Sequence, residues 1–270
     1  MSERPIGLCP LCKLEKRIHE SHFIPNALYP DDIELEYTTP TSSGKGGPQA
    51  KKHLLCGDCE QLFNKNGESE VLSQIAPKTQ KKFPLHDLLK CSSPRETTPA
   101  YLRFSGNDIG VKMDHFAYFA LSLVWRGAIT SWPMPYGNFT TPIQLGNYQE
   151  PIRSFLAGET PLPPEVFVIV CVCVDQESQS VWYEPAPVQD VPYTAFGFLV
   201  RGVYFRVHLG SDTPKDIQNR NCAGPFKAIH AIHFERATLE TKTRIEETQR
   251  RLRSTSSIPL AKMQTPPTGA

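Results

Sequence analysis

Two pairs of cysteines, each with two residues between its members, constrain the fold of this chain more than any other feature. Cys9 and Cys12 form the first pair, and Cys56 and Cys59 form the second, with forty-three residues between the pairs. Four thiolates at ~2.3 Å saturate a tetrahedral Zn²⁺ ion and leave no open position, so such a site is structural. The alternatives are two unrelated pairs or a redox dithiol, and a redox dithiol needs a βαβ context that is absent here. We therefore expect one structural zinc ion that joins two distant parts of the sequence.

Composition and charge exclude several classes of protein. The 270 residues carry a formal net charge of +1, and residues 1–90 contain twelve Lys or Arg and twelve Asp or Glu. No global basic field therefore indicates nucleic-acid binding. Residues 1–25 contain no apolar core of a signal peptide, and the longest apolar run, residues 166–174, is too short to span a bilayer. We expect a cytoplasmic protein that does not enter a membrane, with its eight cysteines reduced.

Apolar periodicity predicts the main helix of the chain at residues 114–130. Asp114 is the expected N-cap. Apolar residues recur at intervals of three and four along one stripe, which indicates the central core helix of a domain. Within this helix, Trp125 and Arg126 are open to two interpretations, which are core packing with a paired arginine or a contact between domains.

Strand signals surround this helix in the sequence. Residues 17–24 and 51–55 favour strands, and a helix that begins near Asp58 is interrupted around Asn66 and Gly67.

The second half of the chain has the pattern of an antiparallel sheet. Residues 166–174 are rich in β-branched side chains and fit a buried strand, with which residues 180–183 could pair. Residues 195–200 and 203–209 bracket Arg201 and Gly202 and are typical of a hairpin. The fold class is therefore α+β.

The chain divides into three predicted parts. Residues 1–80 form a zinc-stapled module. Residues 81–235 form a larger α+β domain of unknown role, with a central helix and antiparallel strands. Residues 236–270 form a charged helix and a tail that we expect to be disordered.

Three side chains near the cysteine pairs could carry chemistry. His22, at the end of a predicted strand, could take a proton from water as a general base, although a single histidine is more often a surface or core residue. Glu60 and Asn64 share one face of the predicted helix and could offer oxygen to a divalent cation. The alternative for this pair is a solvated helix start, with Glu60 near the positive end of the helix dipole.

Two segments resemble the HNH, or ββα-metal, endonuclease family in its zinc-stapled form. One is His22-Phe23-Ile24-Pro25, and the other is Leu54-Leu55-Cys56-Gly57-Asp58-Cys59. The resemblance implies a hairpin followed by a helix, with His22 as the general base. It places Glu60 where the family has a metal-binding histidine and Asn64 at the second ligand position of the helix. Ser21 stands before the catalytic histidine, where the family often has a metal-binding His or Asp.

The chain departs from the family pattern at three points. Ser21 is a poor metal ligand, Glu60 replaces a histidine, and Lys51-Lys52-His53 lacks the asparagine that precedes the Leu-Leu-Cys segment in the family. His19 or Glu20 could substitute as ligands. The Ser-His-x-Ile-Pro and Cys-x-x-Cys-Glu combination, with residues 124–126 in the predicted core helix, also resembles an uncharacterised bacterial HNH-like subgroup.

The resemblance implies an endonuclease that hydrolyses nucleic-acid phosphodiester bonds with Mg²⁺ or another divalent cation at Glu60 and Asn64. We expect DNA ahead of RNA as the substrate, in bacterial defence or a mobile element, and leave homo-oligomerisation open. The alternative is a non-catalytic zinc-binding module for nucleic acid or a protein partner. A third hypothesis places the function in the C-terminal domain, as a sensor or an interaction platform.

Overall fold

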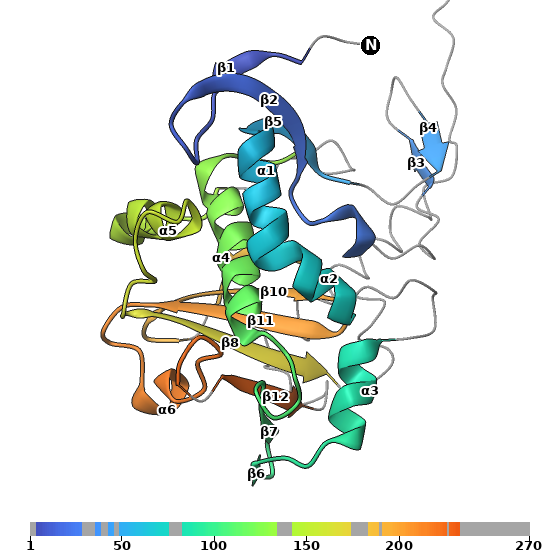
Figure 1. Ribbon diagram of the computed structural model, residues 1–270, viewed down its shortest axis with the longest axis vertical. Coiled ribbons are helices and arrows are strands. Elements are labelled where there is room, and N and C mark those ends of the chain that lie inside the picture. The colour runs from blue at the N-terminus through green and yellow to red at the C-terminus, as the bar shows by residue number, and fades with distance from the viewer. Residues whose placement is uncertain are drawn as a thin grey trace, which may run out of the picture.

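Helix α4, Met113–Ile129, lies at the centre of the computed structural model, between the large sheet and the helices that follow the second cysteine pair (Figure 1). The helix predicted at residues 114–130 is confirmed. Thirteen of its seventeen residues are buried, so its apolar surface extends beyond one stripe, as it must in a helix that is covered on several sides. The predicted N-cap is wrong, because Lys112 holds that position. Asp114 lies in the first turn, where its carboxylate accepts a hydrogen bond from Lys227.

The structure describes residues 4–28, 36–38, 43–45, 49–75, 83–133, 142–173, 183–188, 191–225 and 227–232. The charged helix and tail predicted at residues 236–270 lie outside these ranges. Within them, no helix is both long and apolar enough to cross a membrane.

Seven strands form the large sheet behind α4 (Figure 1). Their order across the sheet is β6 (Glu96–Thr97), β7 (Leu102–Ser105), β12 (Ala228–Ile232), β8 (Val166–Cys173), β11 (Val203–Leu209), β10 (Thr194–Val200) and β9 (Tyr183–Pro187). Five of the six neighbouring pairs are antiparallel, and β12 and β8 are parallel. The α+β class is confirmed, with a sheet that is mixed and not purely antiparallel.

The predicted hairpin in this sheet is confirmed. Strands β10 and β11 pair in register from Thr194 opposite Leu209 to Val200 opposite Val203. Arg201 and Gly202 both have positive φ, 49° and 73°, which is the backbone of a type I′ turn and matches the twist of the two strands.

The predicted partner of the buried strand is wrong. Of residues 180–183, only Tyr183 is described, and it pairs with Leu199 on β10. Strand β8 instead lies between β11 and β12, because a strand that is apolar on both faces belongs in the middle of a covered sheet. Strand β9 contains Pro185 and Pro187, which are tolerated at a sheet edge.

A small sheet and a broken helix form the cysteine region. Its strands are β1 (Ile6–Leu8), β2 (Glu15–His22) and β5 (Lys51–Cys56), in that order and antiparallel. Helix α1, Gly57–Phe63, begins directly after β5 and continues through a π-helical segment, η2 (Asn64–Glu68), into α2 (Ser69–Ile75). The interruption predicted around Asn66 and Gly67 therefore exists as a π-helical turn.

The remaining elements surround this framework: η1 (Asn26–Leu28), β3 (Glu36–Thr38), β4 (Ser43–Lys45), α3 (Pro84–Cys91), η3 (Gly146–Tyr148), α5 (Gln149–Leu156) and α6 (Lys215–Gln218).

One cluster of buried side chains runs through the cysteine region, α4 and the large sheet. Phe63 of α1 meets α4 edge-on at both Tyr118 and Trp125, with ring centroids 5.9 and 6.2 Å apart. On the opposite side of α4, Phe116 stacks on Phe205 of β11 at 6.2 Å. Trp125 therefore contacts the cysteine region and belongs to the core at the same time. The predicted boundary at residue 80 stays a prediction.

Candidate metal centre and hairpin site

The two cysteine pairs come together, as their spacing predicted. The Sγ atoms of Cys9, Cys12, Cys56 and Cys59 all lie within 4.8 Å of one another, and those of Cys12 and Cys56 are 3.9 Å apart. A tetrahedral zinc ion with bonds of ~2.3 Å holds its sulfur ligands about 3.8 Å apart. Three of the four residues are buried and Cys12 is partly exposed. These cysteines could therefore bind a metal ion such as zinc.

Local backbone geometry aims each pair at this point. In the first pair, the N–H of Lys13 donates to the carbonyl of Cys9 at 2.8 Å, and the N–H of Cys9 donates to Leu14 at 2.9 Å. Lys13 closes this tight turn with a positive φ of 59°. In the second pair, Cys56 is the N-cap of α1, and its N–H donates to the Cys9 sulfur at 3.4 Å.

The cysteine cluster favours negative charge at one sulfur. A hydrogen bond from Cys59 lowers the pKa of Cys9 to about 4. The same contact, with burial, raises the pKa of Cys59. Close sulfurs cannot all ionise together unless a cation compensates them. A divalent cation supplies that compensation, and thiolate ligands suit zinc.

A buried arginine braces the first cysteine pair from outside. Arg153 of α5 donates from Nη1 to the carbonyl of Leu11 at 2.5 Å. Its Nε donates to Glu150 at 2.8 Å, and its other nitrogens contact Glu159. These carboxylates hold the pKa of Arg153 above its usual range. Arg153 therefore connects the turn between Cys9 and Cys12 to α5.

Ser21 and Glu60 meet between α1 and the hairpin of β2 and β5. We call these two residues, together with His22, the hairpin site. The Ser21 hydroxyl donates to Glu60 Oε1 and accepts the N–H of Leu55 at 3.2 Å. This contact joins β2, β5 and α1 through one buried side chain. The two positions that hold metal in the family resemblance are thus in direct contact.

His22 lies on the other face of β2, because successive residues of a strand point in opposite directions. Its Nε2 is 3.1 Å from Oε1 of Gln49, and the Gln49 amide nitrogen donates to Asn26. Since Gln49 uses its nitrogen toward Asn26, its oxygen faces His22 as an acceptor. In this arrangement a proton on His22 Nε2 would be donated to Gln49, which would leave Nδ1 as the basic nitrogen.

The other predicted ligands have partners of their own. Asn64 is exposed and accepts a hydrogen bond from Ser69 at 2.7 Å. The ring of His19 accepts from Arg4 at 2.9 Å, and Glu20 pairs with Lys51 at 3.8 Å. Among the residues that the structure describes, the four cysteines are the only group of three or more potential ligands of this kind.

Three residues that contact the site were not assigned to it by any sequence pattern. Gln49 follows a Gly- and Pro-rich stretch, and Arg153 lies more than a hundred residues from the turn that it braces. Arg126 was open to interpretation, and it contacts the backbone of His22. Only the placement of a polar residue at a buried helix position, as for Arg126, could have indicated such a role.

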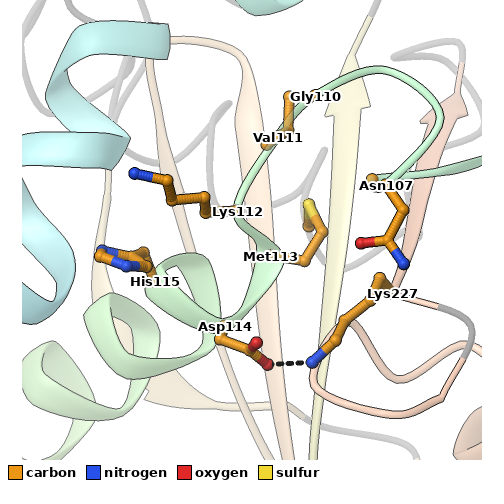
Figure 2. A pocket seen from close by; sticks show the side chains of 9 residues that line it. Asn107, Gly110, Val111, Lys112, Met113, Asp114, His115 and Lys227 are labelled. Carbon is orange, nitrogen blue, oxygen red and sulfur yellow. Dashed lines mark hydrogen bonds and ion pairs between the residues drawn. The ribbon is translucent and has the colours of Figure 1, made fainter.

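A separate hollow lies at the other end of α4 (Figure 2). Its volume is about 440 Å³. Its two lysines are both engaged, since Lys227 contacts Asp114 and Lys112 pairs with Glu70 at 3.6 Å. The length of α4, about 25 Å at 1.5 Å per residue, separates it from the hairpin site.

Comparison of the chain with protein-family models, with curated proteins and with solved structures finds no match to any of them.

Proposed function

We propose that residues 9–64 form a zinc-stapled ββα-metal module of the HNH type, and that this module hydrolyses phosphodiester bonds of nucleic acid. The order of elements supports the proposal, since the antiparallel strands β2 and β5 lead directly into α1. The observation that carries it is the contact of Ser21 with Glu60, the two positions that the resemblance assigns to metal. His22, next to Gln49, points from the opposite face of β2, and this placement favours a non-catalytic module.

In this proposal the four cysteines hold one zinc ion that fixes the hairpin to the helix. His22 accepts a proton from the attacking water at Nδ1, while Gln49 keeps the imidazole in the required tautomer and orientation. Glu60, with oxygen from Ser21 or Asn64, would hold Mg²⁺ or another divalent cation. Such oxygen donors fit Mg²⁺, which binds through one or two carboxylates and completes its shell with water and phosphate. A cation held there would supply polarisation of the phosphate and stabilisation of charge on the leaving oxygen.

We propose DNA ahead of RNA as the substrate, with bacterial defence or a mobile element as the setting. The support for this part is the family resemblance of the two segments around His22 and the second cysteine pair.

A second candidate is a non-catalytic zinc module that binds nucleic acid or a protein partner. The contact between Ser21 and Glu60 favours it, because the carboxylate already has a hydrogen-bond donor. The cysteines are also the one cluster of three or more potential ligands in the described ranges.

Nicking of supercoiled plasmid with Mg²⁺ or Mn²⁺ separates the two candidates. The nuclease proposal expects cleavage by the wild type and a loss of about 100-fold or more in His22→Ala, the usual contribution of a general base. His53→Ala is the matched control, because His53 is exposed on the neighbouring strand β5. We expect it to cleave as the wild type does.

Equal cleavage by the wild type and His22→Ala would sink the nuclease proposal. A wild-type protein that retards plasmid in a gel without cleaving it would support the second candidate.

A further inference from the structure

We propose that Arg126 of the core helix is a positioning residue for His22. The inference rests on the proposed function for its catalytic consequence, and on the described contacts for its structural part. Arg126 lies 104 residues after His22 and belongs to the second predicted domain. This role would make α4 a part of the hairpin site.

The side chain of Arg126 reaches the backbone at the end of β2. Its Nη1 donates to the carbonyl oxygens of both His22 and Phe23, each at 3.3 Å. Strand pairing of β2 with β5 ends at His22 opposite Lys51. One more backbone hydrogen bond, from the N–H of Phe23 to Ala50 at 2.9 Å, follows that pair, and the arginine adds a second anchor at the same point.

The guanidinium is itself held in one orientation. Its Nη2 donates to Glu68 Oε1 at 2.7 Å, and its central carbon lies 4.8 Å from the centre of the Phe63 ring. The side chain is 2% exposed. Glu68 lies in the π-helical segment η2, a type of helical irregularity that is frequent at functional sites.

A second contact holds Phe23 from the end of α4. The Trp132 ring stacks on Phe23, with centroids 5.0 Å apart and planes 11° apart. The indole N–H of Trp132 donates to the backbone carbonyl of Arg126 at 3.0 Å. The side chain of Arg126 thus contacts residues 22 and 23 directly, and its backbone carbonyl holds Trp132, which stacks on Phe23.

A glycine allows α4 to come close enough for these contacts. A Cβ at Gly127 would lie 3.2 Å from the Phe23 ring, so a larger residue would push the hairpin away.

A lysine at position 126 would keep the charge but could not reach two carbonyls and a carboxylate with one planar fork. The arrangement therefore requires arginine specifically.

Arg126→Lys in the full-length chain tests the proposal, with Arg206→Lys as the control. Arg206 is a partly buried arginine on β11. Two measurements apply to each variant: plasmid nicking at saturating DNA, and the imidazole Cε1–H resonance of His22 in NMR. That resonance is assigned by its loss in His22→Gln, and the resonance of His53 is the internal reference.

We expect Arg126→Lys to shift the His22 resonance, leave that of His53 in place, and slow nicking about tenfold or more, because small displacements of a catalytic group are costly. Arg206→Lys should change neither readout. A general loss of stability would not move one histidine resonance selectively.

An unchanged His22 resonance in folded Arg126→Lys would overturn the proposal. If that variant does not fold, Glu68→Gln decides in its place, since it removes the charge that holds the guanidinium and keeps an acceptor. A wild type that does not nick DNA, with a shifted His22 resonance in the variant, would refute the nuclease and keep the positioning role. If the wild type nicks DNA and Arg126→Lys changes neither readout, the nuclease proposal is supported and the positioning role is refuted.

Discussion

Arg153 ties the scaffold to the cysteine cluster through a single carbonyl group. The carbonyl of Leu11 lies between Cys9 and Cys12 in the sequence, and it accepts the Arg153 Nη1 hydrogen at 2.5 Å. Leu11 is fully buried, and Arg153 is 6% exposed. Groups that orient ligands from outside the first coordination sphere commonly set metal affinity. We therefore expect this arginine to affect metal binding, although it offers no ligand atom.

Replacing Arg153 by alanine should weaken zinc binding about tenfold, which is the lower range for loss of an outer-shell partner. The physical reason is that the turn between Cys9 and Cys12 loses the donor that holds Leu11. Competition with a chromophoric chelator measures the change. Arg206→Ala, on β11 of the large sheet, controls for the general effect of removing an arginine. Equal zinc affinity in Arg153→Ala and the wild type would contradict this role.

The segments η2 and α4 approach each other closely at Gly67. A Cβ at Gly67 would lie 3.1 Å from the backbone nitrogen of Phe119 and 3.1 Å from the Tyr118 ring. Both neighbours belong to α4, and a helix backbone cannot yield as a flexible side chain does. The glycine therefore permits the close crossing of the two helical segments.

Gly67→Ala should lower the free energy of unfolding by about 1–3 kcal/mol, the usual range for an overpacked core. This loss opposes the gain of ~1 kcal/mol that alanine brings within an unconstrained helix. Urea denaturation measures the change. Lys65→Ala, at an exposed position of the same segment, is the control and should be close to neutral. A more stable Gly67→Ala would show that α4 does not approach η2 so closely.

Two buried histidines of the large sheet predict a pH dependence of stability. Burial, and then the charge of Arg206, lowers the pKa of His208 to about 3. Burial, and then the charge of Arg220, lowers the pKa of His230 to about 4. Between the ordinary value of 6.5 and these values, the unfolded chain binds protons that the folded chain does not. Stability is therefore complete above about pH 6.5 and declines as the pH falls toward 4.

Each such histidine should steepen this decline by roughly 1.4 kcal/mol per pH unit. His208→Phe removes one of the two groups and keeps an aromatic ring beside Tyr193. We expect the variant to lose stability less steeply than the wild type between pH 6 and pH 4 in urea titrations. Parallel curves for the two proteins would mean that His208 is not kept neutral by the fold.

Elements with strong local patterns could be predicted from the sequence. The helix at residues 114–130 has dense apolar periodicity, and the turn at Arg201 and Gly202 has the residues that a tight hairpin needs, so both were predicted correctly. The partner of β8 was not, because a buried strand carries no signal for which neighbour it meets. The parallel pairing of β12 with β8 joins residues about sixty apart along the chain, and periodicity does not encode such pairings.

The candidate site divides in the same way. The cysteine cluster could be predicted, because two Cys-x-x-Cys pairs are typical of a tetrahedral zinc site. The contacts that surround it depend on side chains brought together by the whole fold, such as Gln49 beside His22 and Arg153 beside Leu11. Neither pair has a local signature, because their contacts exist only after α4, α5 and the hairpin have packed.

Across the described residues, one large buried cluster connects the cysteine region with α4 and the large sheet, and Phe23, Ala50 and Trp132 form a second, small cluster. Phe63 and Val71 of the cysteine region are fully buried, and Phe63 packs on two rings of α4. Buried arginine side chains also connect the two predicted domains, since Arg126 contacts Glu68 and Arg153 contacts Leu11. The cysteine region therefore depends on the scaffold for much of its apolar and polar packing.

A fragment of residues 1–80 should not fold cooperatively, even with zinc, because its apolar face would remain in water. Thermal unfolding followed by near-UV circular dichroism tests this, with the full-length protein as the reference. We expect a sharp transition for the full chain and none for the fragment. A cooperative transition of the zinc-loaded fragment would show an independent domain that ends near residue 80.

We propose that the four cysteines hold one zinc ion, which joins the hairpin of β2 and β5 to α1. The most direct test is the metal content of the purified full-length protein, measured by mass spectrometry of the element. We expect about one zinc ion per chain in the wild type, because four thiolates form one tetrahedral site. We expect loss of that zinc in Cys12→Ser and retention in Cys91→Ser, whose cysteine lies outside the cluster. A folded wild-type protein without zinc, or equal zinc in both variants, would show that the four cysteines do not hold one zinc ion.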